Sequence, residues 1–207
     1  MHTILLIFGE FLVEISLISV YGNPSNILGR LGVLGEANLF LLNPNGILFG
    51  SSASLDVQDS FVATTANAIQ FPNGEVFSAS TPSAPSSLLT INPSAFFFNQ
   101  VSAGAITNYS RTPVGATPDG NQFGLRVPDG QSLLLVGGDI VMDGGGAIAQ
   151  GGRIELGAIA GSGTVELNVD GNDLSLSFPD GADRADISLG NGALVSVNGE
   201  GGGDIQV

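Results

Sequence analysis

The chain lacks cysteine, lysine and tryptophan, and His2 is its only histidine. Without cysteine there can be no disulfide, no thiolate metal site and no cysteine nucleophile. With a single histidine, a Ser-His-acid triad and a histidine-based metal site are excluded as well. The composition therefore removes most of the residues on which common active sites and metal centres depend. We expect a protein that is not an enzyme and holds no cofactor.

Positive charge is also scarce. Five arginines stand against 19 acidic residues, which gives a formal net charge of −14 at pH 7. Such a chain repels nucleic-acid phosphates and anionic membrane surfaces, because it has few cations that could displace counterions. We therefore expect no nucleic-acid partner. The acidic excess is compatible with a secreted or surface-displayed protein.

Aromatic side chains that could stack on sugars are few. The chain has two tyrosines, Tyr21 and Tyr109, and its twelve phenylalanines fall mostly in apolar runs. Tyr109 lies in a polar stretch and is the one candidate for contact with cell-surface glycans. The favoured alternative for Tyr109 is a loop residue that covers the core.

The chain is rich in glycine and in short apolar runs. It contains 31 glycines among 207 residues, with 43% hydrophobic residues and no Gly-X-Y period, so a collagen is excluded. Pairs of Val, Ile and Leu between Gly, Ser and Asn are typical of many short strands joined by tight turns. The sequence predicts an all-β domain that is large enough to bury its own core.

Residues 38–50 contain the motif from which the other turns and strands of the chain are interpreted. Asn43-Pro44-Asn45-Gly46 has the composition of a type I turn, with Asn first, Pro second and Gly fourth. The apolar runs Leu39–Leu42 and Ile47–Phe49 on either side are too short for helices and read as buried strands.

A similar motif, Asn23-Pro24-Ser25-Asn26, stands about twenty residues earlier, and Asn92-Pro93-Ser94 echoes it later. An interval of this length between like turns indicates a coil that returns to the same corner on each lap. Asn side chains in such turns satisfy backbone groups, so a purely structural role is the first interpretation of both motifs.

With its Asn-Pro-Ser-Asn-Ile, Leu-Phe-Leu-Leu-Asn-Pro-Asn-Gly-Ile and Ser-Phe-Val-Ala-Thr-Thr-Ala runs, residues 23–71 closely resemble the filamentous haemagglutinin family. The resemblance is to the two-partner-secretion domain of these exoproteins, also called the haemagglutination activity domain. It continues more loosely through residues 88–100 and 125–167. Together with the recurring corner motif, it favours a right-handed parallel β-helix with an extra-helical loop or hairpin insertion.

The resemblance implies a secretion and adhesion module, exported through an outer-membrane β-barrel transporter that is its dedicated partner. It also implies localisation outside the outer membrane, secreted or at the cell surface, and carbohydrate-dependent haemagglutination by the exoprotein. By resemblance, the secretion-signal residues are Asn23, Pro24, Ser25, Asn26, Asn43, Pro44, Asn45, Gly46 and Ile47.

Three segments are expected. Residues 1–22 are an atypical apolar start, which lacks the basic n-region of a signal peptide and carries Glu10 and Glu14. Residues 23–207 form the β-helix domain, with a loop-rich insertion at about 78–124. We expect the N-terminal part of this chain to be shorter than the corresponding part of other family members. Since the chain ends at Val207 in mid-pattern, we also expect a piece of a longer exoprotein.

The strands are expected to stack as internal aliphatic ladders, with one face of each strand inside the coil and one face in water. After residue 125 short alternating strands recur every eight to twelve residues, which suits either a sandwich or a parallel solenoid. The corner motif and the resemblance favour the solenoid, in which these strands are successive rungs. The inward candidates of the first coils are Leu31, Val33, Leu39, Leu41, Ile47, Phe49, Leu55, Val57, Phe61 and Ile69. We expect the Phe96-Phe97-Phe98 run to pack in a core or against an extra-helical hairpin.

Two alternatives stay open. A carbohydrate-active β-helix enzyme would need two or three converging carboxylates with a basic residue nearby. The chain could also be a non-functional gene fragment. Most acids lie in Asp-Gly turns, so solvated turns are favoured over catalytic or calcium sites. The acids considered are Asp139, Asp143, Asp170, Asp173, Asp180, Asp183 and Asp186.

Overall fold

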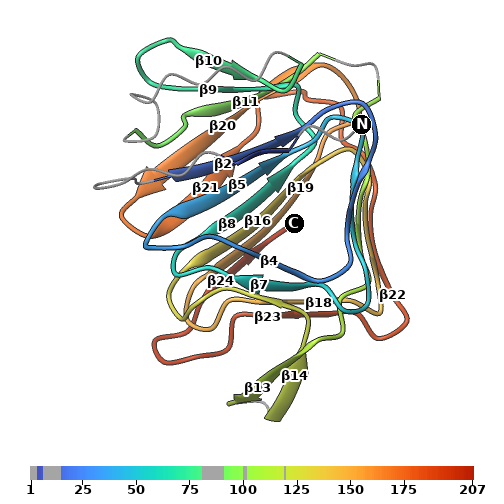
Figure 1. Ribbon diagram of the computed structural model, residues 1–207, viewed down its shortest axis with the longest axis vertical. Coiled ribbons are helices and arrows are strands. Elements are labelled where there is room, and N and C mark those ends of the chain that lie inside the picture. Colours follow the sequence, from blue (N-terminus) through green and yellow to red (C-terminus); the bar gives the residue numbers. More distant parts are fainter. Residues whose placement is uncertain (1–3, 7–14, 81–90, 100–101, 119) are drawn as a thin grey trace.

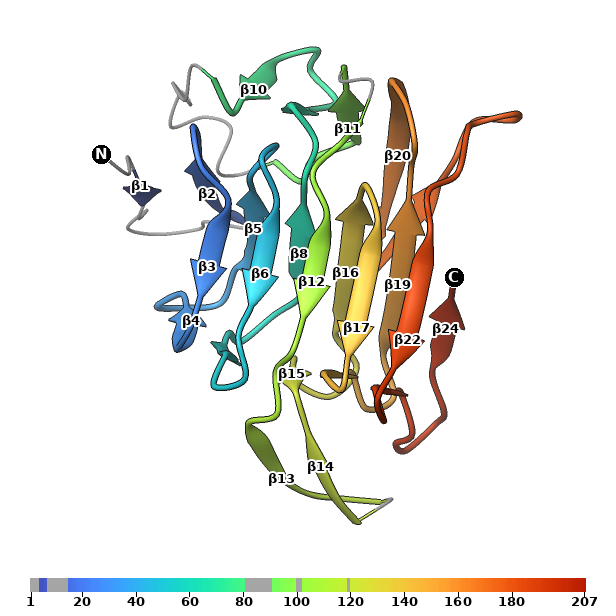
Figure 2. The ribbon, with the colours of Figure 1, turned by 90° about the vertical axis from the view of Figure 1, so that its right-hand side faces the viewer.

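The computed structural model shows a coil of parallel β-strands with three faces (Figure 1, Figure 2). The structure describes residues 4–6, 15–80, 91–99, 102–118 and 120–207. Within these ranges every regular element is a β-strand, and no helix there is long and apolar enough to cross a membrane. The predicted all-β class is confirmed.

The first face is a seven-stranded sheet, which we call sheet A. Its strands are parallel except for β1, which runs antiparallel to β2 at the N-terminal edge. In spatial order they are β1 (Ile4–Leu6), β2 (Ile15–Val20), β5 (Asn38–Leu42), β8 (Phe61–Thr64), β16 (Ser132–Gly137), β19 (Arg153–Ala158) and β24 (Asp204–Gln206).

The second face, sheet B, is wholly parallel and consists of β3 (Ser25–Ile27), β6 (Ile47–Phe49), β12 (Ile106–Asn108), β17 (Ile140–Asp143) and β22 (Ile187–Gly190). The third face is split into two parallel pieces. One piece pairs β4 (Arg30–Gly32) with β7 (Ser54–Asp56), and the other joins β15 (Leu125–Arg126), β18 (Gly146–Ile148) and β23 (Leu194–Ser196).

Each lap of the chain visits sheet A, then sheet B, then the third face, as in the order β5, β6, β7 and the order β16, β17, β18. Seen from the N-terminal end, the laps run clockwise as the chain recedes (Figure 1, Figure 2). The fold is therefore the right-handed parallel β-helix that the sequence predicted.

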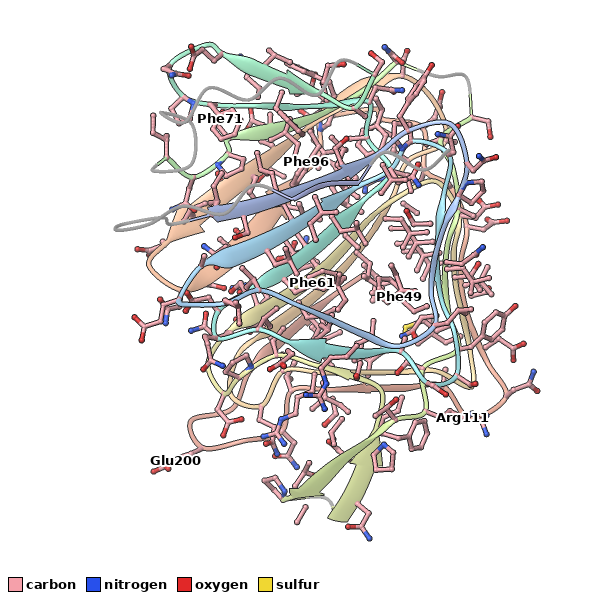
Figure 3. All side chains as sticks on the ribbon, viewed as in Figure 1. Phe49, Phe61, Phe71, Phe96, Arg111 and Glu200 are labelled. Atoms are coloured by element: carbon pink, nitrogen blue, oxygen red, sulfur yellow. The ribbon has the colours of Figure 1, made fainter. Side chains whose placement is uncertain are left out.

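The interior of the coil holds the expected ladders. Leu39, Phe61, Leu133 and Ile154 occupy matching positions on consecutive strands of sheet A, and all four are fully buried. Phe49 and Phe61 meet edge to face at a centroid distance of 6.1 Å (Figure 3). The ladder prediction is confirmed.

The inward candidates are confirmed with one exception, because Ile69 does not lie inside the coil. It belongs to an antiparallel sheet outside, sheet D, which lies against the outer surface of sheet A. In spatial order sheet D consists of β10 (Val76–Ser78), β9 (Ala68–Gln70), β11 (Ala95–Phe98), β20 (Gly163–Asp170) and β21 (Asp173–Ser177).

From β2 to β19 sheet A is consequently covered on both faces, so the expectation that one face of each strand meets water is wrong for these five strands, whereas β24 at the edge is exposed. Phe40 and Leu134 point outward, away from the coil interior, and are fully buried in a second core. Phe40 packs on Phe96 at a centroid distance of 6.5 Å. Figure 3 shows Phe96 in this layer outside the coil. The expectation that the Phe96-Phe97-Phe98 run packs in a core or against an extra-helical hairpin is confirmed, because Phe96 and Phe98 lie in this second core and β11 pairs with β20.

The interpretation of every strand after residue 125 as a rung is also wrong in one place. Residues 163–177 leave the coil as the antiparallel hairpin β20–β21. Alternating apolar residues in this hairpin face sheet A instead of the coil interior, and such an alternation has the same period in both settings.

Another hairpin, β13 (Pro113–Thr117) with β14 (Gly120–Phe123), projects from the third face (Figure 1, Figure 2). The described chain leaves the coil between β8 and β12, between β12 and β15, and between β19 and β22. The division at residue 22 and the insertion at 78–124 stay predictions. Within the expected insertion, residues 81–90, 100–101 and 119 lie outside the described residues.

Candidate functional site

The turn predicted at Asn43-Pro44-Asn45-Gly46 forms the corner between β5 and β6. The backbone N–H of Gly46 donates to the carbonyl oxygen of Asn43 at 3.1 Å, which closes the four-residue turn. The side-chain Oδ1 of Asn43 accepts from the backbone N–H of Asn45 at 2.9 Å. Gly46 has φ of 115°, a conformation that glycine adopts at little cost. The predicted turn is confirmed.

Asn43 is fully buried and connects this turn to the first motif. Its Nδ2 donates to the carbonyl oxygen of Asn23 at 2.9 Å and to Oγ of Ser25 at 2.7 Å. Its backbone N–H donates to the carbonyl oxygen of Thr64 on the next coil at 3.0 Å. One asparagine therefore ties three consecutive coils together at one corner.

The first motif lies directly beside the second, as the spacing predicted, but its conformation differs. Ser25 opens strand β3, and its backbone N–H donates to the carbonyl oxygen of Gly46 at 2.9 Å. Ser25 and Ile47 are register partners in sheet B. Asn23 lies in a bend that follows Gly22, whose φ is 103°. The two motifs thus share a corner without sharing a turn geometry.

The third coil passes this corner with almost no clearance. A Cβ added to Gly104 would lie 2.5 Å from the backbone N of Gly46 and 2.7 Å from the carbonyl oxygen of Pro44. The backbone N–H of Ile47 donates to the carbonyl oxygen of Ala105 at 3.0 Å. Gly104 is a site residue that sequence reasoning missed, and its signal, a single glycine between two alanines, is too common to identify it.

The nine predicted residues fall into two groups. Five are buried and build the corner: Ser25, Asn43, Pro44, Gly46 and Ile47. Four are exposed and face outward from it: Asn23, Pro24, Asn26 and Asn45. The exposed four lie along an open depression of about 700 Å³, which also reaches Leu48 and Thr107 on the outer face of sheet B. The corner therefore presents uncharged amide side chains on a rigid frame.

The third Asn-Pro, Asn92-Pro93-Ser94, is elsewhere. Ser94 donates from its backbone N–H to the carbonyl oxygen of Gln70 at 2.8 Å, just before β11 in sheet D. Asn38 donates from Nδ2 to Oδ1 of Asn92 at 3.4 Å. This motif fastens sheet D near sheet A and takes no part in the corner.

One cluster has the composition required by the enzyme alternative, because three carboxylates surround Arg153. Arg153 contacts Asp173 at 2.6 Å, Asp204 at 3.1 Å and Glu155 at 3.3 Å. The hydrogen bond with Asp173 raises the pKa of Arg153, which keeps the guanidinium charged. Glu155 is buried, and its second oxygen accepts from the backbone N–H of Leu176 at 2.7 Å. These contacts join β19, β21 and β24 and occupy the groups that catalysis would need.

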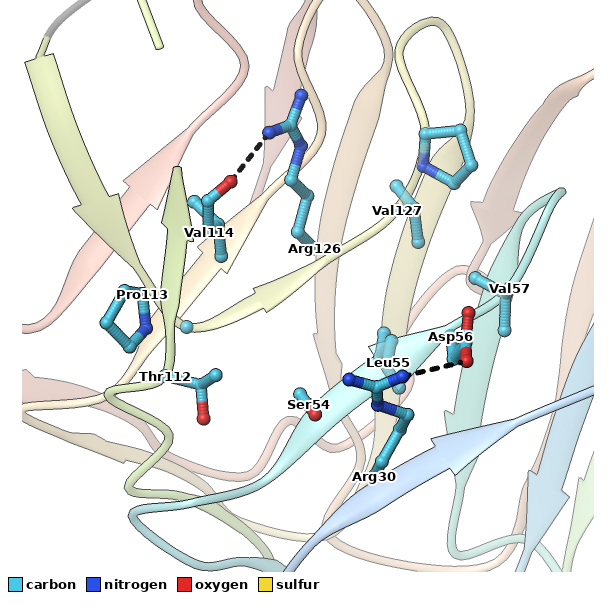
Figure 4. A pocket seen from close by; sticks show the side chains of 12 residues that line it. Arg30, Ser54, Leu55, Asp56, Val57, Thr112, Pro113, Val114, Arg126 and Val127 are labelled. Atoms are coloured by element: carbon cyan, nitrogen blue, oxygen red, sulfur yellow. Dashed lines mark hydrogen bonds and ion pairs between the residues drawn. The ribbon is translucent and has the colours of Figure 1, made fainter. Parts of the chain in front are cut away.

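A second hollow, of about 440 Å³, lies between the third face and the base of the β13–β14 hairpin (Figure 4). Arg126 donates from Nη1 to the carbonyl oxygen of Val114 at 3.0 Å, and Arg30 pairs with Asp56 at 3.4 Å (Figure 4). Arg126 also pairs with Asp129 at 2.9 Å. Both arginines are paired with acids of this chain, and Arg126 fastens the hairpin to the coil.

The other candidates are scattered. Asp139 accepts from the backbone N–H of Asp186 at 3.2 Å, and Asp143 accepts from Nδ2 of Asn191 at 2.5 Å. Over the described part of the chain, no three His, Cys, Asp or Glu residues group as a metal site would require. Tyr109 follows β12 and is 36% exposed. A glycan contact at Tyr109 stays a prediction.

Comparison with known proteins identifies a family. A family model described as the TPS secretion domain matches residues 20–207. No curated protein and no solved structure matches the chain. The matched range contains both Asn-Pro motifs of the corner and every strand from β3 to β24.

Proposed function

Because the chain belongs to the TPS secretion-domain family, we propose that the corner of the two Asn-Pro motifs is the surface its outer-membrane transporter recognises. The family is a secretion module and not an enzyme family, and its domains direct export across the outer membrane through a transporter partner. The observation that carries the proposal is the division of the motif residues into a buried frame and an exposed row.

The buried group supplies rigidity. Asn43 makes hydrogen bonds within its own coil and to the coils on both sides, so its removal would loosen the corner as a whole. Residues in this group affect export through the shape and stability of the corner.

The exposed group supplies the contact. Asn23, Asn26 and Asn45 present carboxamides, each able to donate and accept hydrogen bonds. Strand β3, which carries Asn26, has β6 on one side and, among the strands that the structure describes, is the last of sheet B on the other. A partner strand added there would gain backbone hydrogen bonds without any charged group, with the amides setting the register. The transporter is a β-barrel in this proposal, and adhesion to host cells belongs to the exoprotein it exports.

The test is an export assay in cells that contain the cognate transporter. Asn23→Ala, Asn26→Ala and Asn45→Ala are combined in one chain, with Asn121→Ala, an exposed asparagine of β14, as the matched control. We expect the triple variant to stay folded, with only a small fall in melting temperature, because Asn45→Ala removes one long bond of 3.3 Å to Oδ1 of Asn43. Its export should fall at least about tenfold, since several lost hydrogen bonds to the transporter total more than 1.4 kcal/mol. Normal export of the stable triple variant would refute the proposal.

A further inference from the structure

The β20–β21 hairpin, residues 163–177, which we call the strap, is an addition to an otherwise complete coil. Gly137 pairs with Ala158, and Ile140 pairs with Ile187, so the fourth and fifth coils are in register on both sides of one corner. The fourth coil crosses that corner with Gly138 and Asp139 alone. The fifth coil places residues 159–186, which include the strap, between the same two positions.

The strap is a single layer over the outer surface of sheet A. Val165, Leu167, Leu174 and Leu176 face the sheet and are buried, whereas the residues between them are exposed or half-buried. Its apolar face covers Leu134 and Val136 of β16, which are fully buried in the same core. The strap therefore supplies part of the apolar cover of these two side chains, in a core that it shares with Phe96 and Phe98 of β11.

The strap is attached to the coil by side chains. The backbone N–H of Leu174 donates to Oγ of Ser132 at 2.9 Å, and that of Leu176 donates to Oε2 of Glu155 at 2.7 Å. Ser132 also donates to the carbonyl oxygen of Asn172 at 3.2 Å. The two acceptors, the side chains of Ser132 and Glu155, belong to the fourth and fifth coils. The backbone groups of these two coils are paired with each other in the ladder between β16 and β19. Release of the strap leaves that ladder intact.

One glycine provides the close fit. A Cβ at Gly157, on the outer side of β19, would lie 2.6 Å from Cζ of Phe178 and 3.0 Å from Cδ1 of Leu176. The φ of Gly157 lies outside the left-handed region, so its strand conformation suits any residue. The glycine thus leaves room for Leu176 of the strap and for Phe178 directly after it, and the backbone of the coil does not need it.

We infer that the strap is a closing element, which docks on and releases from sheet A as a unit while the coil stays folded. Its release breaks the pairing of β20 with β11, the apolar contact with β16 and the side-chain contacts with the coil. Those side-chain contacts are the bonds of Ser132, Glu155 and Ser60 to strap backbone groups and the ion pair of Arg153 with Asp173. The ladders inside the coil are untouched by it. The inference concerns the folded chain alone and does not depend on transporter recognition.

The test is amide hydrogen exchange, followed by mass spectrometry, on the purified chain. Gly157→Val places a branched side chain under the strap without changing the coil interior. The matched control is Gly190→Val in β22, where an added Cβ meets no atom within 4 Å. In Gly157→Val we expect residues 163–177 and 95–98 to exchange roughly ten- to a hundredfold faster, as overpacking of this size implies. Residues 132–137 and 153–158 should keep their wild-type protection.

A second variant replaces residues 159–186 with Gly-Asp, copying the corner of the fourth coil. We expect this strapless chain to retain the exchange protection of the coil and to bind a hydrophobic dye through the uncovered face of sheet A. The inference is overturned if Gly157→Val loses protection throughout the coil or exchanges like the wild type. It is equally overturned if the strapless chain is unfolded.

Discussion

The side-chain amide of Asn43 donates a hydrogen bond of 2.7 Å to the hydroxyl of Ser25, a residue one full lap earlier in the coil. Both residues are buried, so water cannot replace the bond when either partner is removed. The pair explains why two similar motifs stand one lap apart. The second motif supplies the side chain that holds the first in place.

Replacement of Asn43 by alanine should lower the free energy of unfolding by about 2–3 kcal/mol, because it leaves buried polar partners unsatisfied. Asn43→Asp should cost more at pH 7 than at pH 4, since a carboxylate would face the carbonyl oxygen of Asn23 and a protonated acid can donate to it. Urea denaturation at the two pH values measures both effects. Asn121→Ala, in exposed β14, is the control, and an Asn43→Ala chain as stable as this control would contradict the bridging role.

The contact between Gly104 and the turn gives a second prediction. Gly104→Ala should destabilise the chain by about 1–3 kcal/mol, because the new Cβ meets backbone atoms of Pro44 and Gly46 that cannot rotate away. Gly29→Ala is the matched control, since a Cβ there meets no atom within 4 Å. It should be neutral or slightly stabilising, as expected where alanine fits the native backbone. Equal melting temperatures for the two variants would show that the corner tolerates movement of the third coil.

The coil and its corner could be predicted from the sequence because local chemistry determines them. Asn43, Pro44 and Gly46 each have a turn preference, and the interval between the two motifs fixes one lap. Once the lap length is known, the stacking of Leu39, Phe61 and Leu133 can be predicted from it.

Sheet D could not be predicted in the same way. Val165, Leu167 and Leu174 alternate with polar residues as a rung does, and strand periodicity does not say which apolar surface a strand meets. The sequence signal for sheet D is the unbroken apolar run in β16. Its residues Leu134 and Val136 alternate with the inward residues, so they point out of the coil and need a second apolar layer to bury them. A strand that is apolar on both faces indicates a second layer.

The second core gives the third prediction. Phe96 is fully buried between sheets D and A and contacts Phe40, whereas its neighbour Phe97 is only half-buried. Phe96→Ala should therefore lower the free energy of unfolding by about 3–5 kcal/mol, the usual cost of a large cavity. Phe97→Ala, the matched control on the same strand, should cost about 1 kcal/mol, typical of a residue outside a core. Chemical denaturation of the two variants measures the difference, and equal losses would mean that the outer core contributes little.

The last prediction concerns pH and the carboxyl of Glu155. Burial raises the pKa of Glu155 above its ordinary value of 4.5, although the Leu176 N–H and Arg153 act in the opposite direction. The folded chain therefore binds a proton at this site more readily than the unfolded chain does. Its contribution to stability is fully present below about pH 4.5 and is lost as the pH rises through the folded pKa.

Glu155→Gln isolates this contribution, because the amide keeps an oxygen for the Leu176 N–H but does not titrate in this range. The free energy of unfolding of the wild type, minus that of Glu155→Gln, should increase as the pH falls from 7 to 4.5, by about 1.4 kcal/mol for each unit of difference between the folded and unfolded pKa. Denaturation of both proteins across this range measures it, and other titrating groups cancel in the subtraction. A constant difference, or one that decreases on acidification, would mean that Arg153 outweighs burial at this site.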